Sequence, residues 1–463
     1  MSVIYKKIQQ IIGPLLFLKN EHNAQFGEIA LIRTKDDKVR MGQIVKMSEE
    51  IIVVEVFEDT TGLSTENAEI TFTEDTFKVK ISKDMFGQTF NSLGKPIDIK
   101  TKAILDSDLL SDVQRDINGF PINPYAREYP EDIIQTGISV IDGLFTLIRG
   151  QKLPIFSGQG LPHNKLAAQI ATQAKVFSEE PFVIIFCGIG IVQDEAIYFL
   201  NRFQESGSIQ NIISFINFAD DPIIERLLIP RVALTTAEYF AFEKDMHVLA
   251  ILLDMTNYAE ALRELSSAKE EIPSRKGYPG YIYSDFASLY ERTGKIKGKK
   301  GTITQIPILT MPSDDISHPI SDTTGYITEG QLVLSRSLHK KAIYPPFEVL
   351  ASISRLMKDA IGKEKTREDH ADVSSQLLSA YSNYLEVKDL ISIVGEDGLS
   401  YEQKNFLNFG MDFEQKFLNQ KVNENRDFET TLNLAWEVLS NLTIAQLFRI
   451  HQKYLDKYYK IKV

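Results

Sequence analysis

A glycine-rich segment at residues 152–166 contains residue types that could cradle a phosphate group. An apolar run leads into Ser157, Gly158 and Gly160, and a predicted helix follows. In phosphate loops a strand leads into such a turn, because backbone N–H groups and the helix N-terminus then point at the anion. Ser157, Gly158 and Gly160 are therefore the candidate phosphate-contacting residues of this chain.

The same segment lacks most of the side chains that phosphate chemistry needs. The full motif reads Gly, four residues, Gly-Lys-Ser/Thr. With Gly158 in the first position, His163 replaces the second glycine, Asn164 the lysine and Lys165 the hydroxyl residue. No fixed cation then meets the β- and γ-phosphates, and Mg²⁺ loses its protein anchor. Pro162 also removes a backbone donor. These residues alone leave two interpretations open, a relic phosphate loop and an ordinary glycine turn before a helix.

An acidic residue follows a second apolar run. Residues 248–253 are all apolar, and Asp254 comes directly after them. In nucleotide-hydrolysing enzymes such an acid holds Mg²⁺, often through water. Many buried strands also end in an aspartate that caps the next helix. The position of Asp254 is consistent with both roles.

The elements that must position these residues fall into three regions, at residues 1–76, 77–358 and 359–463. In the first region, alternating runs such as 53–58 and turn signals such as 61–62 predict short strands. Strands at this spacing predict a small β-barrel or sandwich at the N-terminus, and a barrel would leave no exposed sheet edge. The alternative is that they are edge strands of the next domain.

The second region alternates buried-strand runs with segments of helical length. The strand runs are residues 153–156, 182–187, 212–216, 248–253 and 305–311, and the helical segments include 165–177 and 195–204. This alternation predicts a central α/β domain built on a parallel sheet that is covered on both faces.

The third region predicts a C-terminal helical domain. Thr366 followed by Asp369 resembles a capping box with a shorter acid. Three apolar stripes follow at helical spacing: Val373, Leu377, Tyr381 and Tyr384; then Phe406, Phe409, Phe413 and Phe417; then Leu432, Trp436, Leu439 and Leu442. We interpret these aromatic stripes as core.

Composition excludes several classes of protein. Among 463 residues, 43% are hydrophobic and 25% charged, which is typical of a globular chain and not of a collagen or a disordered protein. The formal charge of −12 argues against a nucleic-acid partner, which needs a basic footprint.

The single cysteine, Cys187, cannot form an intrachain disulfide, so a reduced cytoplasmic setting is expected. The apolar stretches are too short to span a membrane, which leaves a cytosolic protein or one that docks on a membrane assembly.

Taken together, the motifs resemble those of one protein family almost end to end. The resemblance is carried by residues 135–139, 156–163, 254–264, 277–281, 305–312, 325–331 and 365–371, including Asp-Met-Thr-Asn-Tyr-Ala-Glu-Ala-Leu-Arg-Glu from position 254. The chain resembles the B subunits of the V/A-type rotary ATPases.

The resemblance implies an architecture and a set of partners. B subunits alternate with catalytic A subunits in a six-membered ring around a central shaft, with a peripheral stalk and a separate membrane sector that moves H⁺ or Na⁺. Each has an N-terminal β-barrel, a central α/β domain of the P-loop NTPase (RecA-like) kind and a C-terminal helical bundle. ATP or ADP with Mg²⁺ is then bound mainly by the A subunit, and this chain is expected to be cytoplasmic, peripheral to the membrane.

The resemblance also points to a second loss of catalytic function. In catalytic relatives a Gly-Glu-Arg segment after the strand that follows the phosphate loop supplies the carboxylate that orients the attacking water. Here that segment is Gly188-Ile189-Gly190. An isoleucine can neither accept a proton nor orient water. Together with Asn164, Ile189 implies that this chain does not hydrolyse ATP at its own loop.

The resemblance also predicts a functional role for one arginine. The family's B subunit supplies an arginine to the A subunit's site from a Ser-x-Ser-Arg-Leu sequence, which here is residues 352–356 and places the role on Arg355. A guanidinium can bind two oxygens of the γ-phosphate at once. Relatives commonly have other residues where Phe347, Glu348 and Ala351 stand, so the geometry of the preceding loop differs. The alternative is that Arg355 forms a structural salt bridge.

Two other functions compete with that of an accessory ring subunit. A self-sufficient ring ATPase, of the export or RNA-motor kind, would need the lysine and glutamate that this chain lacks. A purely structural collar would need no active-site role for Arg355. The remaining features are weaker: the basic run 295–300 is interpreted as a solvated hairpin tip, His370 as a helix-start residue, and His163 as no metal ligand.

Overall fold

A computed structural model describes residues 4–5, 8–20, 24–34, 38–66, 68–105, 113–177 and 180–460. The chain forms two compact units, each built from three segments. The first unit comprises the described residues of Met1–Pro121, Ile184–Lys244 and Leu252–Arg292, and the second those of Ile122–Val183, Asp245–Ile251 and Thr293–Val463. The predicted division at residues 76 and 358 is a different partition of the chain and stays a prediction.

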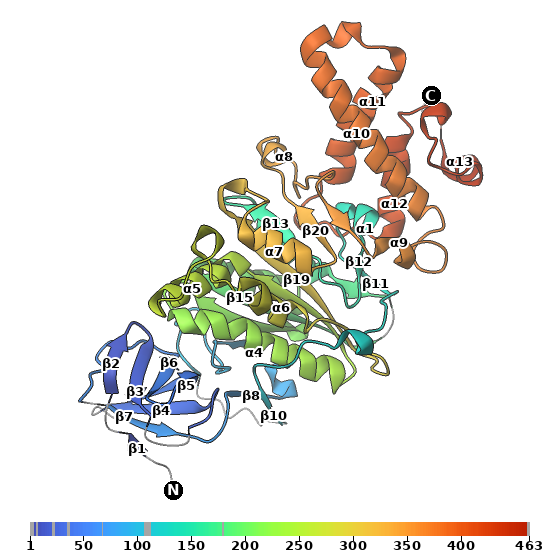
Figure 1. Cartoon of the computed structure of the whole chain (residues 1–463). Coiled ribbons are helices and arrows are strands. Elements are labelled where there is room, and N and C mark those ends of the chain that lie inside the picture. Colours follow the sequence, from blue (N-terminus) through green and yellow to red (C-terminus); the bar gives the residue numbers. More distant parts are fainter. Residues whose placement is uncertain are drawn as a thin grey trace. The chain divides into compact units, whose positions relative to one another are not determined.

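The first unit begins with the predicted β-barrel, drawn in blue in Figure 1. Its antiparallel strands follow the order β1-β7-β4-β5-β6-β3-β2 and are β1 (Ile4–Tyr5), β2 (Ile8–Ile12), β3 (Leu15–Lys19), β4 (Ile29–Thr34), β5 (Val39–Met47), β6 (Ile51–Val56) and β7 (Ala68–Phe72). Side chains from these strands form a common core that includes Leu16, Ile32, Ile44, Val54 and Ile70. These strands pair with one another, so they are not edge strands of another sheet.

The rest of the first unit is α/β. Strand β8 (Lys78–Ile81) pairs with β10 (Val113–Asp116), and β16 (Ile212–Phe218) lies parallel to β9 (Thr89–Phe90) and to β15 (Phe182–Ile191). Its helices are α3 (Gln193–Glu205), α4 (Ile223–Phe242), α5 (Met255–Ala268) and α6 (Ile282–Tyr290). The boundary between the two units passes through β15 and through β17 (His247–Leu253).

The second unit holds the strands around the glycine-rich loop. Strand β13 (Ile155–Gly158) lies parallel to β19 (Thr302–Met311) on one side and to β20 (Gly330–Val333) on the other. Strands β21 (Ile353–Ser354) and β18 (Gly294–Lys295) are added antiparallel to β20 and β19. The helices here are α2 (His163–Gln173), α7 (Pro319–Ile327), α8 (Arg336–Lys340) and α9 (Met357–Ala360). All five predicted strand runs are confirmed, and the parallel sheet with them.

A small antiparallel sheet corrects one helix prediction. Strand β11 (Ile133–Gln135) pairs with β12 (Leu147–Ile148) and β14 (Lys175–Val176), and α1 (Ser139–Leu144) follows β11. The helix predicted over 165–177 therefore ends at Gln173. Residues 175–176 leave it because their backbone pairs with β11, a long-range contact that local periodicity does not show.

The C-terminal part of the second unit is helical, as predicted. Helix α10 (His370–Val394) and α11 (Tyr401–Asp412) form a hairpin (Figure 1), followed by the π-helical η7 (Phe413–Leu418), α12 (Phe428–Leu439) and α13 (Gln452–Tyr458). The predicted stripes are buried, except that Phe406 is only half-buried. Phe413 stacks between Phe409 and Phe417, with centroids 5.6 and 5.2 Å away.

The predicted capping box at the start of α10 is wrong. Asp369 is itself the N-cap residue, and its carboxylate makes no cap hydrogen bond. It accepts instead from Arg367 Nε at 2.7 Å and from Trp436 Nε1 at 2.6 Å. The Thr366 hydroxyl accepts from the backbone N–H of Gly362 at 2.9 Å. Other partners, of which Trp436 is distant along the chain, have taken both groups that a capping box would use.

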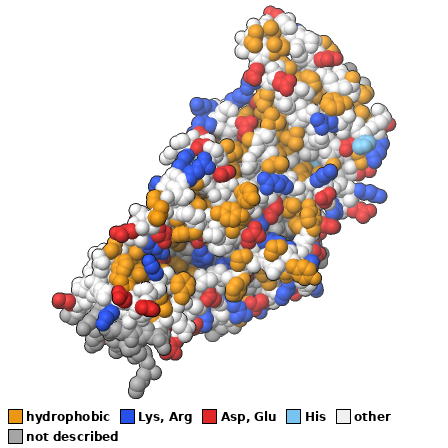
Figure 2. Space-filling view, viewed as in Figure 1, with side chains coloured by type: hydrophobic (Ala, Val, Ile, Leu, Met, Phe, Trp, Pro, Cys, Tyr) orange, Lys and Arg blue, Asp and Glu red, His pale blue; other side chains and the backbone are white. Residues whose placement is uncertain are grey.

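Two properties of the whole chain bear on its setting. No helix within the described residues combines the length and the apolar character that crossing a bilayer requires. On the face drawn in Figure 2, Lys and Arg side chains are interspersed with Asp and Glu, and no basic stripe stands out. Such a mixture is typical of a charged, water-facing surface.

Candidate functional site

The glycine-rich loop has the predicted strand–turn–helix path. Strand β13 ends at Gly158, a turn covers residues 159–162, and α2 begins at His163. Gly160 lies in this turn with a positive φ of 78° and open space around its Cα, which suits glycine. The backbone path of a phosphate loop is therefore present.

Two backbone donors of this loop are used within the loop, and a third is missing. The N–H of Leu161 donates to Gly158 O at 3.1 Å, and the N–H of His163 donates to Leu161 O at 2.9 Å. Pro162 has no N–H. The buried Ser157 hydroxyl pairs with His163 Nδ1 at 2.9 Å. A bound phosphate would therefore miss three backbone donors that an open loop offers.

An ion pair lies over Gly158. Arg336 Nε donates to Asp314 Oδ2 at 2.6 Å, its Nη2 to Asp314 Oδ1 at 2.9 Å and to the carbonyl of Gln159 at 3.0 Å. A Cβ on Gly158 would overlap the Asp314 carboxylate and lie 2.8 Å from Arg336 Nη2. Hydrogen bonding from the guanidinium lowers the pKa of Asp314 below its ordinary value. The space beside Gly158 is thus filled by an ion pair whose charges largely cancel, and not by an unpaired cation that could meet a phosphate.

The substituted motif positions add no compensating group. Asn164 is half-buried at the lysine position, and Lys165 points to solvent at the hydroxyl position. Neither side chain supplies the fixed cation or the Mg²⁺ ligand that the motif requires. The residues present at this loop therefore do not fit Mg-ATP.

Arg355 follows β21 and is exposed. Its backbone N–H donates to Glu329 O at 2.9 Å, and its Nη1 donates to Thr328 O at 3.0 Å. Both acceptors are neutral carbonyls. Within the described part of the chain no carboxylate pairs with this guanidinium, so the structural salt-bridge interpretation is not supported. The arginine keeps a charge that a partner's anion could use.

Residues of the first unit account for the other two predicted positions. The Ile189 side chain is fully buried in β15, and Asn257 Nδ2 donates to the carbonyls of Ile189 and Gly190 at 2.9 and 3.2 Å. Asp254 is the N-cap of α5 and accepts from the N–H of Thr256 at 2.9 Å. The helix-cap interpretation of Asp254 is therefore confirmed. The described residues contain no group of three or more His, Cys, Asp or Glu placed to hold a metal ion.

The weaker candidates have structural explanations. Residues 295–300 span the turn of the β18–β19 hairpin, and residues 297–300 are exposed, as predicted. His370 is the first residue of α10, as predicted, and its ring bonds Thr366 Oγ1 and Gly143 O, each at 3.0 Å. Burial lowers the pKa of His370 to about 4. Burial also raises the pKa of the Cys187 thiol, so this cysteine is a neutral core residue.

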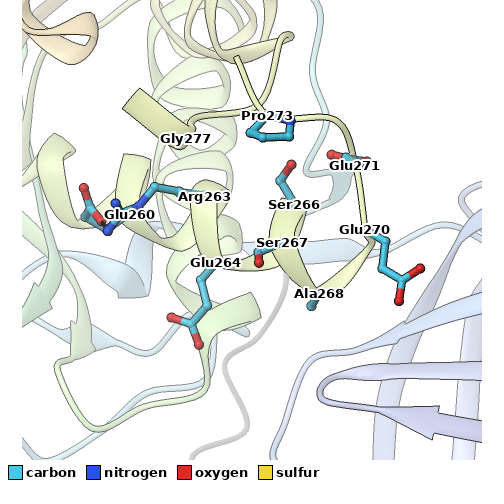
Figure 3. A pocket seen from close by; sticks show the side chains of 10 residues that line it. All are labelled: Glu260, Arg263, Glu264, Ser266, Ser267, Ala268, Glu270, Glu271, Pro273 and Gly277. Atoms are coloured by element: carbon cyan, nitrogen blue, oxygen red, sulfur yellow. Dashed lines mark ion pairs between the residues drawn. The ribbon is translucent and has the colours of Figure 1, made fainter. Parts of the chain in front are cut away.

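A separate cavity of about 920 Å³ lies beside α5 in the first unit (Figure 3). Four glutamates line it, Glu260, Glu264, Glu270 and Glu271, and Glu260 forms an ion pair with Arg263. The excess of carboxylates makes this hollow unsuitable for a nucleotide phosphate. We do not place nucleotide chemistry there.

Sequence reasoning missed two ion pairs near these positions: Asp314 with Arg336, and Lys152 with Glu329, which is described below. Glu329 lies within the segment 325–331, which carried the family resemblance, but nothing in its spacing points to Arg355 or Lys152. Asp314 and Arg336 have charges that suit a pair, yet only the fold brings them to Gly158.

Three family models match successive parts of the chain. The model of the ATP synthase alpha/beta family, beta-barrel domain, matches residues 8–74. The nucleotide-binding domain of the same family matches residues 137–354, and the C-terminal domain of V and A type ATP synthase matches residues 359–459.

Individual relatives cover nearly the whole chain. A V-type ATP synthase beta chain from Halothermothrix orenii is 53% identical over 457 residues, which cover 98% of this chain and 97% of that protein. A solved structure of a unique ATP synthase subunit, NeqB from Nanoarcheaum equitans, is 41% identical with a TM-score of 0.73 and covers 92% of this chain and 98% of that one. The chain therefore belongs to the V-type ATP synthase beta-chain family, whose members are subunits of V/A-type ATPases.

Proposed function

We propose that this chain is the non-catalytic B subunit of the V/A-type ring. It alternates with catalytic A subunits and supplies Arg355 in trans to the nucleotide held at the A–B interface. ATP hydrolysis or synthesis there is coupled to H⁺ or Na⁺ transport. Two observations together carry the proposal. Asp314 fills the space beside Gly158 in the glycine-rich loop, whereas Arg355 is exposed and its hydrogen-bond acceptors are neutral carbonyls.

The chemistry asked of Arg355 suits its side chain. Phosphoryl transfer spreads negative charge over the γ-phosphate oxygens, and a forked guanidinium can bind two of them. An arginine supplied in trans is worth about 10³–10⁵ in rate, or roughly 4–7 kcal/mol of barrier. In the hydrogen bond from Arg355 to Thr328 O only the donor is charged, so a phosphate oxygen, which adds the opposite charge, can replace the carbonyl.

Mg²⁺ and the nucleotide are assigned mainly to the A subunit. The residues at this chain's own loop do not fit Mg-ATP, as described above, so Ser157, Gly158 and Gly160 are at most vestigial contacts. When bound by the partner, Mg-ATP supplies the γ-phosphoryl group. This chain's part is to place one positive charge against it.

The remaining partners follow from the same assignment. We propose that the chain contacts the central shaft and the peripheral stalk, and reaches the membrane sector only through them. Its setting is then cytoplasmic and peripheral to the membrane. The formal charge of −12 and the mixed surface charges of Figure 2 support a function without nucleic acid.

The alternatives are disfavoured by particular residues. A self-sufficient ring ATPase would need a lysine at position 164 and a carboxylate at position 189, where Asn164 and Ile189 stand. A structural collar would not need Arg355. Substitution of Arg355 therefore separates the collar from the proposed subunit.

The test uses the complete ring assembled with its A subunits. We expect Arg355→Ala to leave assembly unchanged and to lower Mg-ATP hydrolysis by about 10³-fold or more. Arg449→Ala is the matched control, because Arg449 bonds Ser375 in the helical region and contacts no loop of the proposed site. Near-normal turnover by an assembled Arg355→Ala ring would refute the role of this residue.

A second measurement separates this proposal from an independent ATPase. The purified chain alone, at high concentration and free of contaminating ATPases, is expected to show no Mg-ATP turnover. Turnover that co-purifies with the chain would mean that Asn164 and Ile189 do not prevent ATP hydrolysis by this chain.

A further inference from the structure

Within the described residues, the hydrogen bonds that Arg355 donates run to one neighbouring segment, residues 328–329. Its backbone N–H binds the carbonyl of Glu329 and its guanidinium binds the carbonyl of Thr328, at 2.9 and 3.0 Å. These bonds lie where β20 and β21 begin to pair, with Gly330 opposite Ser354. The position of the guanidinium therefore depends on the position of residues 328–329.

Glu329 is in turn fixed to one buried residue. Its Oε1 lies 2.8 Å from the ammonium of Lys152, and its Oε2 accepts from the backbone N–H of Lys152 at 2.8 Å. The N–H of Glu329 donates back to the carbonyl of Lys152 at 3.1 Å. The Lys152 side chain is only 2% exposed. Three contacts thus join residues 152 and 329.

Neighbouring contacts strengthen the same attachment. Gln151 Nε2 donates to Ser354 Oγ at 2.9 Å and lies 3.3 Å from Glu329 O. Gly330 lets β20 approach closely, since a Cβ there would overlap the carbonyl of Ile353 and lie 2.9 Å from Leu153 Cδ1. Residues 151–153, which lead into β13, therefore hold the segment that carries Arg355.

We propose that Glu329 and Lys152 are positioning residues for Arg355. This inference rests on the proposed function of Arg355 and extends it. The ion pair, in which the Lys152 side chain is 2% and the Glu329 side chain 28% exposed, fixes residues 328–329 on the segment that leads into β13. It thereby sets how far the guanidinium reaches toward the partner's nucleotide. A buried pair is a poor source of net stability, because desolvation offsets the attraction, but it fixes geometry when both partners are present.

The expected effect is on catalysis more than on binding. Misplacing a catalytic group by about 1 Å can cost roughly 10²-fold in rate. In rings that carry Glu329→Gln, we expect kcat to fall by about 10–10²-fold with KM within about twofold, since the lost contact acts in the transition state. Affinity for Mg-ADP with aluminium fluoride, a transition-state mimic, should fall while affinity for Mg-ADP alone stays unchanged.

Two further variants keep the test decisive. Glu329→Gln leaves the Lys152 ammonium buried without its carboxylate, which can destabilise the fold. The double variant Lys152→Met/Glu329→Met removes both charges and is expected to assemble and to show the same loss of kcat. The control Lys341→Met/Glu414→Met removes a comparable pair, 2.6 Å long with Glu414 7% exposed, and should change neither kcat nor the ratio of the two affinities.

A combined substitution tests whether the pair acts through the arginine. In the Arg355→Ala background, Glu329→Gln should cause no further loss of kcat, because the group it positions is already absent. An additional loss there would overturn the positioning role. So would normal kcat in the assembled Glu329→Gln and double variants, or a kcat loss with an unchanged affinity ratio.

The outcomes for the two proposals are distinguishable. If Arg355→Ala abolishes turnover while both pair variants keep it, only the positioning inference fails. If Arg355→Ala keeps turnover, the proposed function fails first. If the double variant does not assemble at all, the pair is required for folding and its assignment to positioning is wrong.

Discussion

The carboxylate of Asp314 lies against Gly158, in the space that a Cβ on that residue would fill. Arg336 holds the carboxylate there and also binds the carbonyl of Gln159. The loop is thus changed in two ways. Its own residues lack the groups that bind phosphate. In addition, the ion pair of Asp314 and Arg336, which are far from the loop along the sequence, lies over the turn. Restoring the motif residues alone would leave the second obstacle in place.

We therefore expect Asn164→Lys/Lys165→Thr to leave the isolated chain without saturable ATP binding below about 1 mM, which corresponds to roughly 4 kcal/mol. The physical reason is that Asp314 fills the space beside Gly158 and holds Arg336 in an ion pair. In addition, Pro162 has no N–H, and the N–H of His163 is already bonded to Leu161 O. Isothermal titration calorimetry with Mg-ATP measures the affinity.

Removing the Asp314 carboxylate should show how strongly it weakens ATP binding. Adding Asp314→Ala to that double variant is expected to tighten ATP binding, whereas adding Asp315→Ala, at a neighbour that binds Ser317, should not. Micromolar affinity in the double variant alone would contradict the role given to Asp314.

Lysine should not replace Arg355. Arg355→Lys keeps one positive charge but loses the fork that can bind two phosphate oxygens. We expect the assembled ring with Arg355→Lys to lose at least about 10²-fold in Mg-ATP turnover, within the range assigned to a finger arginine. Steady-state hydrolysis of matched, fully assembled rings measures this loss. Turnover within a few-fold of the parent ring would mean that a point charge is sufficient.

Gly330 should tolerate no side chain. Its φ is 156°, and a Cβ would overlap the carbonyl of Ile353. Gly330→Ala is therefore expected to cost about 1–3 kcal/mol in stability and to displace the β20–β21 pairing. Thermal unfolding of the purified chain checks this. Gly280→Ala is the control, because no atom lies within 4 Å of a Cβ placed there, and an equal melting temperature for both variants would count against the steric argument.

Stability should fall at mildly acidic pH through His370. Burial lowers its pKa to about 4, below its unfolded value of about 6.5. The unfolded chain then binds more protons between those two values, so folding loses free energy as the pH falls through that window. The loss between pH 7 and pH 5 should reach about 2 kcal/mol.

The comparison variant is His370→Gln, which keeps a donor for Gly143 O but does not titrate. Its melting temperature should drop less than that of the parent chain between pH 7 and pH 5. Equal drops in the two proteins would show that His370 does not govern this dependence.

The sequence predicted the features that depend on local periodicity. The stripe from Val373 to Tyr384 became the buried face of α10, and alternation in the first region produced the barrel. Predictions failed where a tertiary partner competed with a local one. Asp369 binds Trp436 in place of capping α10, and residues 175–176 pair with β11 in place of extending α2.

The candidate site was predictable only in part, for the same reason. Losses at Asn164 and Ile189 are visible in the sequence because a motif states which residue should stand there. The attachment of Arg355 to Lys152 through Glu329 is not visible, because Lys152 and Glu329 are 177 residues apart along the chain and no local rule links them. The fold alone brings these groups together.

The path of the chain between its two units has a consequence for biosynthesis. The polypeptide changes unit after residues 121, 183, 244, 251 and 292. Strand β13 is complete at Gly158, but its neighbour β19 ends at Met311. At 5–20 residues per second, a nascent chain holds that apolar strand unpaired for roughly 10–30 s. The strands of the barrel all lie within the first 72 residues, so the barrel can form early on the ribosome. The sheet that contains β13 forms only late in translation, and its apolar strands need protection by chaperones until then.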